Sequence, residues 1–345
     1  MKNSAQMSRI INRIGWSFLK SVGLKKKRMA QLLGRTRLDA EQINLLEEMR
    51  EANSASRSPF RASDIWIQLS KRFDDWFWWE GIEDVESQEM NGFFSSPRPG
   101  NIKLLRYACW MFYQTLKARD KFSLLSKIPA TANPESGLAF EFEGHLVSWD
   151  LLISIDTMNS LIEADPAILT EPVIVVDLGA GWGRMGYVLK KVNPNCTYVI
   201  CDLPEALLVS STYLPKLLPY EKFHYFSKNR SIREFNKETF KNGDVFFLGA
   251  QDLEYFADNT VNFFISIASF QEMTPKQVNE YFDLIDRKVN GVFFTQQLFE
   301  AKTHHWQIGE ISGYNDYPFR SNWKKMYFRP ATFSDLYFET AYQIL

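Results

Sequence analysis

The chain has 345 residues, a length that predicts a main domain with an appendage. With 45% hydrophobic residues and a formal net charge of -1 it can bury a sizeable core, and no apolar run approaches the roughly 20 residues of a membrane-spanning helix. The N-terminus lacks the apolar core of a secretory signal. An odd set of cysteines without paired spacing favours reduced thiols and a cytoplasmic protein: Cys109, Cys196 and Cys201.

Positive charge is concentrated at the start of the chain. Residues 1–38 hold ten Lys or Arg and no acidic residue, so the remainder carries 30 basic against 41 acidic residues. Hydrophobic residues recur here at helical spacing: Met7, Ile11, Ile14, Phe18 and Val22. Such a basic amphipathic helix either lies on anionic lipid at the inner membrane face or docks on an acidic partner; a mobile basic tail is the alternative. Nucleic acid is not an expected partner, because the acidic body would repel phosphate.

Residues 39–130 predict a helical accessory region ahead of the main domain at 131–345. Helical patterns run from Asp39 to Asn53 and from Asp64 to Trp79. A third predicted helix, at 102–119, places four hydrophobic residues on one face: Leu105, Cys109, Phe112 and Leu116. A fourth, at 146–163, leads towards the next strand.

The most informative stretch is 173–184, with the sequence VIVVDLGAGWGR. Its β-branched residues predict a buried parallel strand, and Asp177 stands where that strand ends. Glycine then occupies every second position, at Gly179, Gly181 and Gly183. A turn without side chains lets a ligand lie against backbone N–H groups, and a carboxylate beside it suits a cationic or hydroxylated ligand better than a pyrophosphate.

Strands and helices alternate from residue 173 onwards, which predicts a doubly wound, mostly parallel α/β sheet of Rossmann-like type. Further strands are expected at 197–202, 244–249, 261–268 and 291–298. Helices are expected at 183–191, 205–214 and 274–289, the last with Thr274 as its cap and Pro275 in its first position. The segments 326–328 and 338–345 predict a closing antiparallel hairpin.

A second acidic residue, Asp202, ends the strand at 197–202, where a carboxylate suits a ribose diol. Residues 181–186 also read G-x-G-x-x-G, the dinucleotide fingerprint. That interpretation requires its first glycine directly after the strand. Gly179 holds this place, and the sixth position counted from it is Arg184 rather than a small residue. The spacing therefore favours a turn for S-adenosylmethionine, which these residues resemble in class I methyltransferases.

Three further segments resemble the bacterial sugar O-methyltransferase family: 201–205 (CDLPE), 269–275 (SFQEMTP) and 144–152 (GHLVSWDLL). The likeness covers roughly residues 130–345. It implies a seven-stranded class I methyltransferase sheet, S-adenosylmethionine as cofactor, and a sugar hydroxyl of a glycan or glycoconjugate as acceptor. The expected donor-site residues are Asp177, Gly179, Gly181, Gly183, Asp202, Leu203, Gln251, Asp252 and Ser269, with Gln251 or Asp252 reaching the adenine.

A sugar hydroxyl is a weak nucleophile, so a general base would accelerate transfer by about 10²–10⁴-fold. Glu272 follows the fourth predicted strand, and His304 and His305 follow the fifth, at the edge where open α/β sheets bind ligands. Glu272, His304 and His305 are the predicted catalytic residues. His145 and Asp150 are the next candidates for the base. No recognised metal-ligand spacing is present, so no metal is expected. A nicotinamide-dependent oxidoreductase and a catalytically silent binding module remain alternatives.

Overall fold

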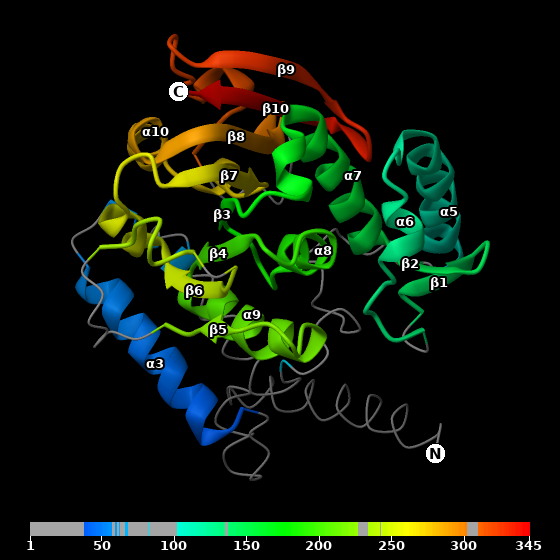
Figure 1. The fold of residues 1–345 in the computed structure, drawn as a ribbon, viewed down its shortest axis with the longest axis horizontal. Helices are drawn as coiled ribbons and strands as arrows, with labels where there is room; N and C mark the ends of the chain where they lie inside the picture. Colours follow the sequence, from blue (N-terminus) through cyan, green and yellow to red (C-terminus); the bar gives the residue numbers. More distant parts are fainter. Residues whose placement is uncertain are drawn as a thin grey trace, which may run out of the picture.

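An eight-stranded sheet organises the protein (Figure 1). The structure, a computed structural model, describes residues 38–56, 59–60, 62, 66–67, 82, 102–134, 137–226, 234–241, 243–301 and 310–345. In spatial order the strands are β5 (Phe223–His224), β6 (Val245–Gly249), β4 (Thr197–Asp202), β3 (Ile174–Leu178), β7 (Val261–Ile267), β8 (Val289–Leu298), β10 (Ser334–Ile344) and β9 (Lys324–Ala331).

The sheet is parallel from β5 to β8, and β10 then pairs antiparallel with both β8 and β9. This confirms the doubly wound, mostly parallel fold and its closing hairpin. The expected number of seven strands is wrong, because β5 adds a parallel edge strand through Phe223 and His224. Two residues are too short to show a periodic pattern in the sequence.

Except for the short α6, which the sequence did not predict, the helices lie close to the predicted positions. They are α3 (Ala40–Ala55), α5 (Ile102–Arg119), α6 (Leu124–Lys127), α7 (Trp149–Ala164), α8 (Arg184–Val192), α9 (Pro204–Leu217) and α10 (Pro275–Lys288). Asp39 and Thr274 each form a capping box, which fixes the first turns of α3 and α10. The helix expected from Asp64 to Trp79 lies outside the described residues, apart from 66–67.

A β-hairpin precedes α7 where the sequence predicted the start of a helix. β1 (Ala139–Phe142) pairs antiparallel with β2 (His145–Ser148), so the prediction of helix from residue 146 is wrong. Glu143 and Gly144 make the turn with positive φ angles of 52° and 80°, as a two-residue hairpin loop requires. Ser148 ends β2 and caps α7, since its hydroxyl accepts a hydrogen bond from the Leu151 N–H at 3.1 Å.

Alternate residues of the strands belong to two hydrophobic cores. Val175 packs in a core shared with α7, α8 and α9, whereas its neighbour Val176 packs in a core shared with α10. The parallel strands are therefore apolar on both faces, which explains their continuous hydrophobic runs. All three cysteines are buried, and none of them forms a disulfide.

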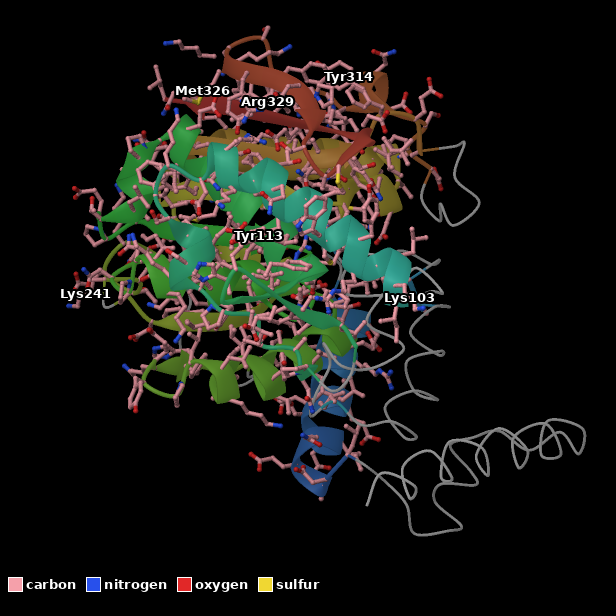
Figure 2. The ribbon with its side chains drawn as sticks, turned by 90° about the vertical axis from the view of Figure 1, so that its right-hand side faces the viewer. Lys103, Tyr113, Lys241, Tyr314, Met326 and Arg329 are labelled. Atoms are coloured by element: carbon pink, nitrogen blue, oxygen red, sulfur yellow. The ribbon has the colours of Figure 1, made fainter. Side chains whose placement is uncertain are left out.

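The accessory helices are attached to the main domain by ion pairs and packing. Arg50 of α3 bonds Glu205 in the first turn of α9 at 2.7 Å. Arg119 at the end of α5 bonds Asp156 of α7 at 2.8 Å. α5 crosses the face of the molecule turned to the viewer in Figure 2. The predicted basic amphipathic helix, up to residue 37, lies outside the described residues.

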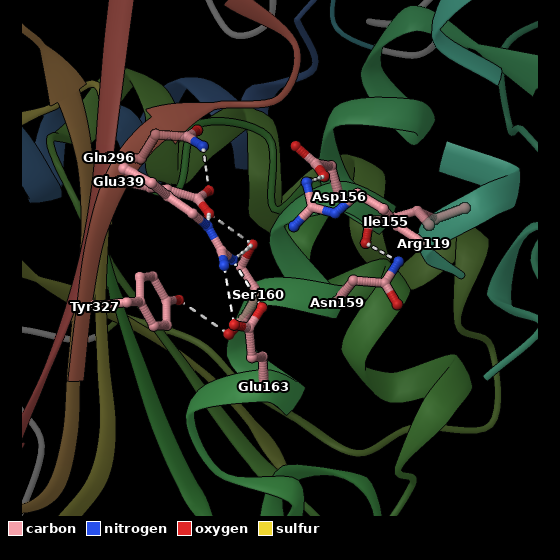
Figure 3. Close-up of polar contacts among 10 residues, drawn as sticks. Arg119, Ile155, Asp156, Asn159, Ser160, Glu163, Gln296, Tyr327 and Glu339 are labelled. Carbon is pink, nitrogen blue, oxygen red and sulfur yellow. Dashed lines mark hydrogen bonds and ion pairs between the residues drawn. The ribbon is translucent and has the colours of Figure 1, made fainter. Parts of the chain in front are cut away.

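A buried polar network holds α7 against the antiparallel end of the sheet (Figure 3). Glu339 of β10 is fully buried and accepts hydrogen bonds from Arg329 at 2.7 Å, Ser160 at 3.0 Å and Gln296 at 3.3 Å. Arg329 also binds Glu163 with two nitrogens, both at 2.9 Å. The network compensates the desolvated charge of Glu339.

We expect Arg329→Ala to destabilise the protein by about 3–5 kcal/mol, because it leaves the Glu339 charge buried without its cation. Urea unfolding of the two proteins measures the difference. Lys117→Ala provides the control, since its pair with Glu143 is exposed to solvent and should contribute far less to stability than the buried pair. Equal losses in the two variants would contradict this assignment.

Candidate functional site

The glycine turn after β3 is built from left-handed backbone. Gly179, Gly181 and Gly183 have φ angles of 76°, 60° and 89°, which side chains with a Cβ rarely adopt. The Gly179 N–H donates to the Cys201 carbonyl at 2.9 Å, and the Gly181 N–H donates to the Asp202 carboxylate at 2.8 Å. The turn is therefore bound to the end of the neighbouring strand β4.

Ser269 fills the space beside Gly179. A Cβ on Gly179 would lie 2.3 Å from the Ser269 Oγ, so no larger residue fits there while Ser269 holds this position. Ala268, which joins β7 to Ser269, has a φ of 54°, a strained conformation for a residue with a Cβ. Ser269 thus lies against the turn, through contacts that link the ends of β3 and β7. Its role in a donor site stays a prediction.

Asp202 lies at the end of β4 with backbone donors on both carboxylate oxygens. Besides Gly181, the N–H of Leu203 donates to it at 2.7 Å. Burial raises the pKa of Asp202 to about 7, against the lowering effect of these two donors, and the charges of Asp177 and Glu205 raise it further. Two N–H donors leave part of the acceptor capacity of a carboxylate unused.

Asp177 is more enclosed than Asp202. Tyr198 of β4 donates a hydrogen bond to its carboxylate, and burial raises the pKa of Asp177 to about 6 although Tyr198 and Arg184 lower it. The Tyr198 ring lies against Gly186 in α8, where a Cβ would be 2.4 Å from the ring. Gly186, the last glycine of the fingerprint, is therefore required by helix–strand packing.

Gln251 and Asp252 begin the 3-10 helix Ala250–Tyr255 after β6, and the structure separates their roles. Asp252 accepts a hydrogen bond from the Gly249 N–H at 2.9 Å and so caps this helix. The Oε1 of Gln251 is buried and has no hydrogen-bond partner in the described part of the chain. Of the two predicted residues, Gln251 therefore has the acceptor to offer a ligand.

Glu272 follows β7 in the short 3-10 helix Phe270–Glu272. The Glu272 side chain is half-buried, so solvent still reaches part of it. Burial and the nearby charge of Asp202 raise the pKa of Glu272 to about 8, although a hydrogen bond from Trp66 lowers it. Asp202 at the end of β4 and Glu272 in the helix after β7 are thus close enough to interact electrostatically.

Three further residues join this site that the sequence did not single out. Gln271 hydrogen-bonds Tyr337 of β10, whose pKa is raised by burial and by Glu272 and lowered by Gln271 and Arg184. Arg184, the first residue of α8, binds Asp150 at 3.2 Å. Tyr337 pairs with Leu298, so the antiparallel strand begins at the edge where β8 ends. No local motif marks Tyr337 in the sequence.

The other predicted candidates for the base are His304, His305, His145 and Asp150. His304 and His305 lie outside the described residues. His145 and Asp150 do not share the helix predicted for them, because His145 lies in β2. Asp150, in the first turn of α7, accepts the Trp182 indole N–H at 2.9 Å and supports the glycine turn. The described residues contain no group of His, Cys, Asp or Glu suited to a metal ion.

Comparison with known proteins finds solved structures that match at low sequence identity. No protein-family model and no curated protein matches the sequence. A protein from Pyrococcus horikoshii OT3 is 14% identical, with 57% of this chain and 92% of that chain covered and a TM-score of 0.41. A SAM-dependent methyltransferase from Aquifex aeolicus is 13% identical, with 55% of this chain and 90% of that chain covered and a TM-score of 0.34. The SAH-bound magnesium protoporphyrin IX methyltransferase from Synechocystis PCC 6803 is 10% identical, with 69% of this chain and 96% of that chain covered and a TM-score of 0.38.

The strand order itself defines the fold. Parallel strands in the order β6-β4-β3-β7-β8, followed by the antiparallel pair β10 and β9, form the class I, Rossmann-like methyltransferase sheet. The antiparallel strand between β8 and β9 also distinguishes it from a dinucleotide-binding domain of two βαβαβ halves.

Glu272 predicts how stability depends on pH. Its folded pKa of about 8 lies above the ordinary glutamate value of 4.5, so the folded state retains a proton that the unfolded state releases. This contribution to stability is complete below about pH 4.5 and is lost as the pH rises through 8. Urea unfolding across this range should show a shallower decline for Glu272→Gln than for the wild type.

Glu163→Gln is the matched control for that measurement. Its partner Arg329 lowers the pKa of Glu163, so this group loses its contribution as the pH falls, in the opposite sense. A Glu272→Gln variant with the same pH dependence as the wild type would contradict the raised pKa.

Proposed function

We propose that the protein is an S-adenosylmethionine-dependent O-methyltransferase that modifies a sugar hydroxyl in bacterial glycan or glycoconjugate biosynthesis. The observation that carries this proposal is the series of groups along three adjacent strand ends. The glycine turn follows β3, Asp202 ends β4, and Gln251 follows β6. Open α/β sheets bind their ligands at this edge.

The chain's residues fit this donor part by part. The left-handed glycines leave backbone uncovered for the methionine portion, and the spare acceptor capacity of Asp202 suits the two hydroxyls of a ribose. The orphaned Oε1 of Gln251 would accept the amino group of adenine, which removes the cost of burying an unpaired acceptor. Asp177 lies within the protein, where Tyr198 donates a hydrogen bond to it.

When bound, S-adenosylmethionine supplies an electrophilic methyl group on a cationic sulfur. Glu272 is the proposed base, because a carboxylate with a pKa of about 8 takes up a proton near neutral pH. Tyr337, with its raised pKa, stays protonated and offers a hydrogen-bond donor to the acceptor. His304 and His305 remain alternative bases.

A sugar as acceptor is supported by the neighbours of Glu272 and by the sequence. The rings of Trp66 and Tyr337 lie beside a carboxylate and an amide, and such a mixture of flat apolar surface and polar groups suits a sugar. The segment 269–275, which carries the family resemblance, also supplies Ser269, Gln271 and Glu272 to the site. Transfer to a phenol or an amine with no sugar accepted would overturn the substrate class alone.

We expect calorimetry to detect binding of S-adenosylhomocysteine and not of NAD. Asp202→Ala should lose about 1.5–3 kcal/mol of this affinity, the range for hydrogen bonds to a charged group. In the wild type the affinity should increase as the pH rises through about 7, because only the ionised carboxylate accepts both ribose hydroxyls. Unchanged binding by Asp202→Ala would remove the residue from the donor site, and binding of NAD alone would favour an oxidoreductase.

Glu272→Gln should lower the turnover of an accepted sugar by about 10²-fold or more while donor binding stays intact. The wild-type rate should increase with pH up to about 8 as Glu272 ionises, and the variant should lose this dependence. Normal turnover in this variant would transfer the role to His304 or His305, whose alanine variants are tested alongside. Donor binding without turnover on any acceptor would favour a silent binding module.

A further inference from the structure

The first half of α5 exposes a row of large apolar side chains. Its buried residues, among them Leu105 and Cys109, pack inwards, and four large hydrophobic residues on the other side remain in contact with solvent. A fifth, Ile102, is exposed at the start of the helix on the same face as Cys109. Their exposed fractions are 57% for Ile102, 56% for Leu104, 60% for Tyr107, 42% for Trp110 and 47% for Met111. A contiguous surface of this kind on a helix indicates an interaction site.

This surface projects past the start of α7, on the side of the proposed active site. Phe112 packs on Trp149 with ring centroids 5.4 Å apart, and Arg119 pairs with Asp156. The two contacts are seven residues apart on each helix, so α5 and α7 run parallel and residues 102–111 continue beyond the N-terminus of α7. That terminus adjoins the glycine turn through the bond between Asp150 and Trp182.

The charge of α5 identifies the kind of partner. The helix contains four basic residues and no acidic one. Lys117 and Arg119 form ion pairs with Glu143 and Asp156, whereas Lys103 and Arg106 are exposed among the hydrophobic residues of its first half. The chain before α3 has the same bias, with ten basic residues and no acid up to residue 38. Aromatic and aliphatic side chains flanked by cations are typical of surfaces that dock on anionic lipid. Two copies pairing through α5 would instead bring like charges together.

We propose that residues 102–111 of α5 dock the protein on an anionic phospholipid bilayer. The aromatic and aliphatic side chains enter the headgroup region, and Lys103 and Arg106 lie near the lipid phosphates. α5 lies on the surface and does not cross it, since no described helix is long and apolar enough to span a membrane. Docking turns the carboxyl edge of the sheet towards the lipid, and it holds whether or not the protein transfers methyl groups.

Flotation of the full chain with vesicles tests this proposal. The protein should float with vesicles of phosphatidylcholine and phosphatidylglycerol and much less with phosphatidylcholine alone. Tyr107→Ser combined with Trp110→Ser should weaken binding by about tenfold, and so should Lys103→Gln combined with Arg106→Gln. Tyr220→Ser combined with Tyr255→Ser is the matched control, because it removes two exposed aromatic rings elsewhere.

Several results would overturn the proposal. One is a wild-type protein that does not float with the anionic vesicles. Another is binding that both α5 variants keep in full, which would assign it to the basic N-terminal segment. A third is a dimer by light scattering that becomes a monomer in the Tyr107 and Trp110 variant, which would make a second copy the occupant of this surface.

Discussion

The hydrogen bond from the Gly181 N–H to Asp202 is the contact on which the site depends. At 2.8 Å it fixes the glycine turn to the end of β4, and the neighbouring Leu203 N–H holds the other carboxylate oxygen. The turn thereby keeps a left-handed backbone without side chains to brace it. Ser269 supports it from β7, so three strand ends define one rigid edge.

Acidic groups accumulate at this edge because parallel strands end together. Asp177 and Asp202 lie near the ends of β3 and β4, and Glu272 follows β7 in a short helix. Burial raises the pKa of each to between about 6 and 8. Arg184 offsets part of this charge and is itself held by Asp150 of α7. A cationic ligand at this edge would favour the ionised carboxylates, and the proposed sulfonium donor is such a ligand.

Much of the fold was predictable where local chemistry decides it. The glycine turn, the strand ends and the Thr274–Pro275 start of α10 all follow from short motifs and regular periodicity. The hairpin before α7 was missed because its two strands have only four residues each. Tyr337 and Trp66 could not be foreseen, since tertiary packing alone brings residues so far apart in sequence to Glu272.

Two glycines near the turn also restrict which amino-acid substitutions the protein can accept during evolution. Gly186 leaves room for the ring of Tyr198, and Gly179 leaves room for Ser269, each with less than 3 Å to a hypothetical Cβ. Neither position can enlarge unless its partner shrinks, although 12 and 90 residues separate the pairs. In homologous sequences each glycine should therefore change together with its partner. Part of a glycine pattern that looks like a ligand-binding motif is then explained by packing against neighbouring side chains.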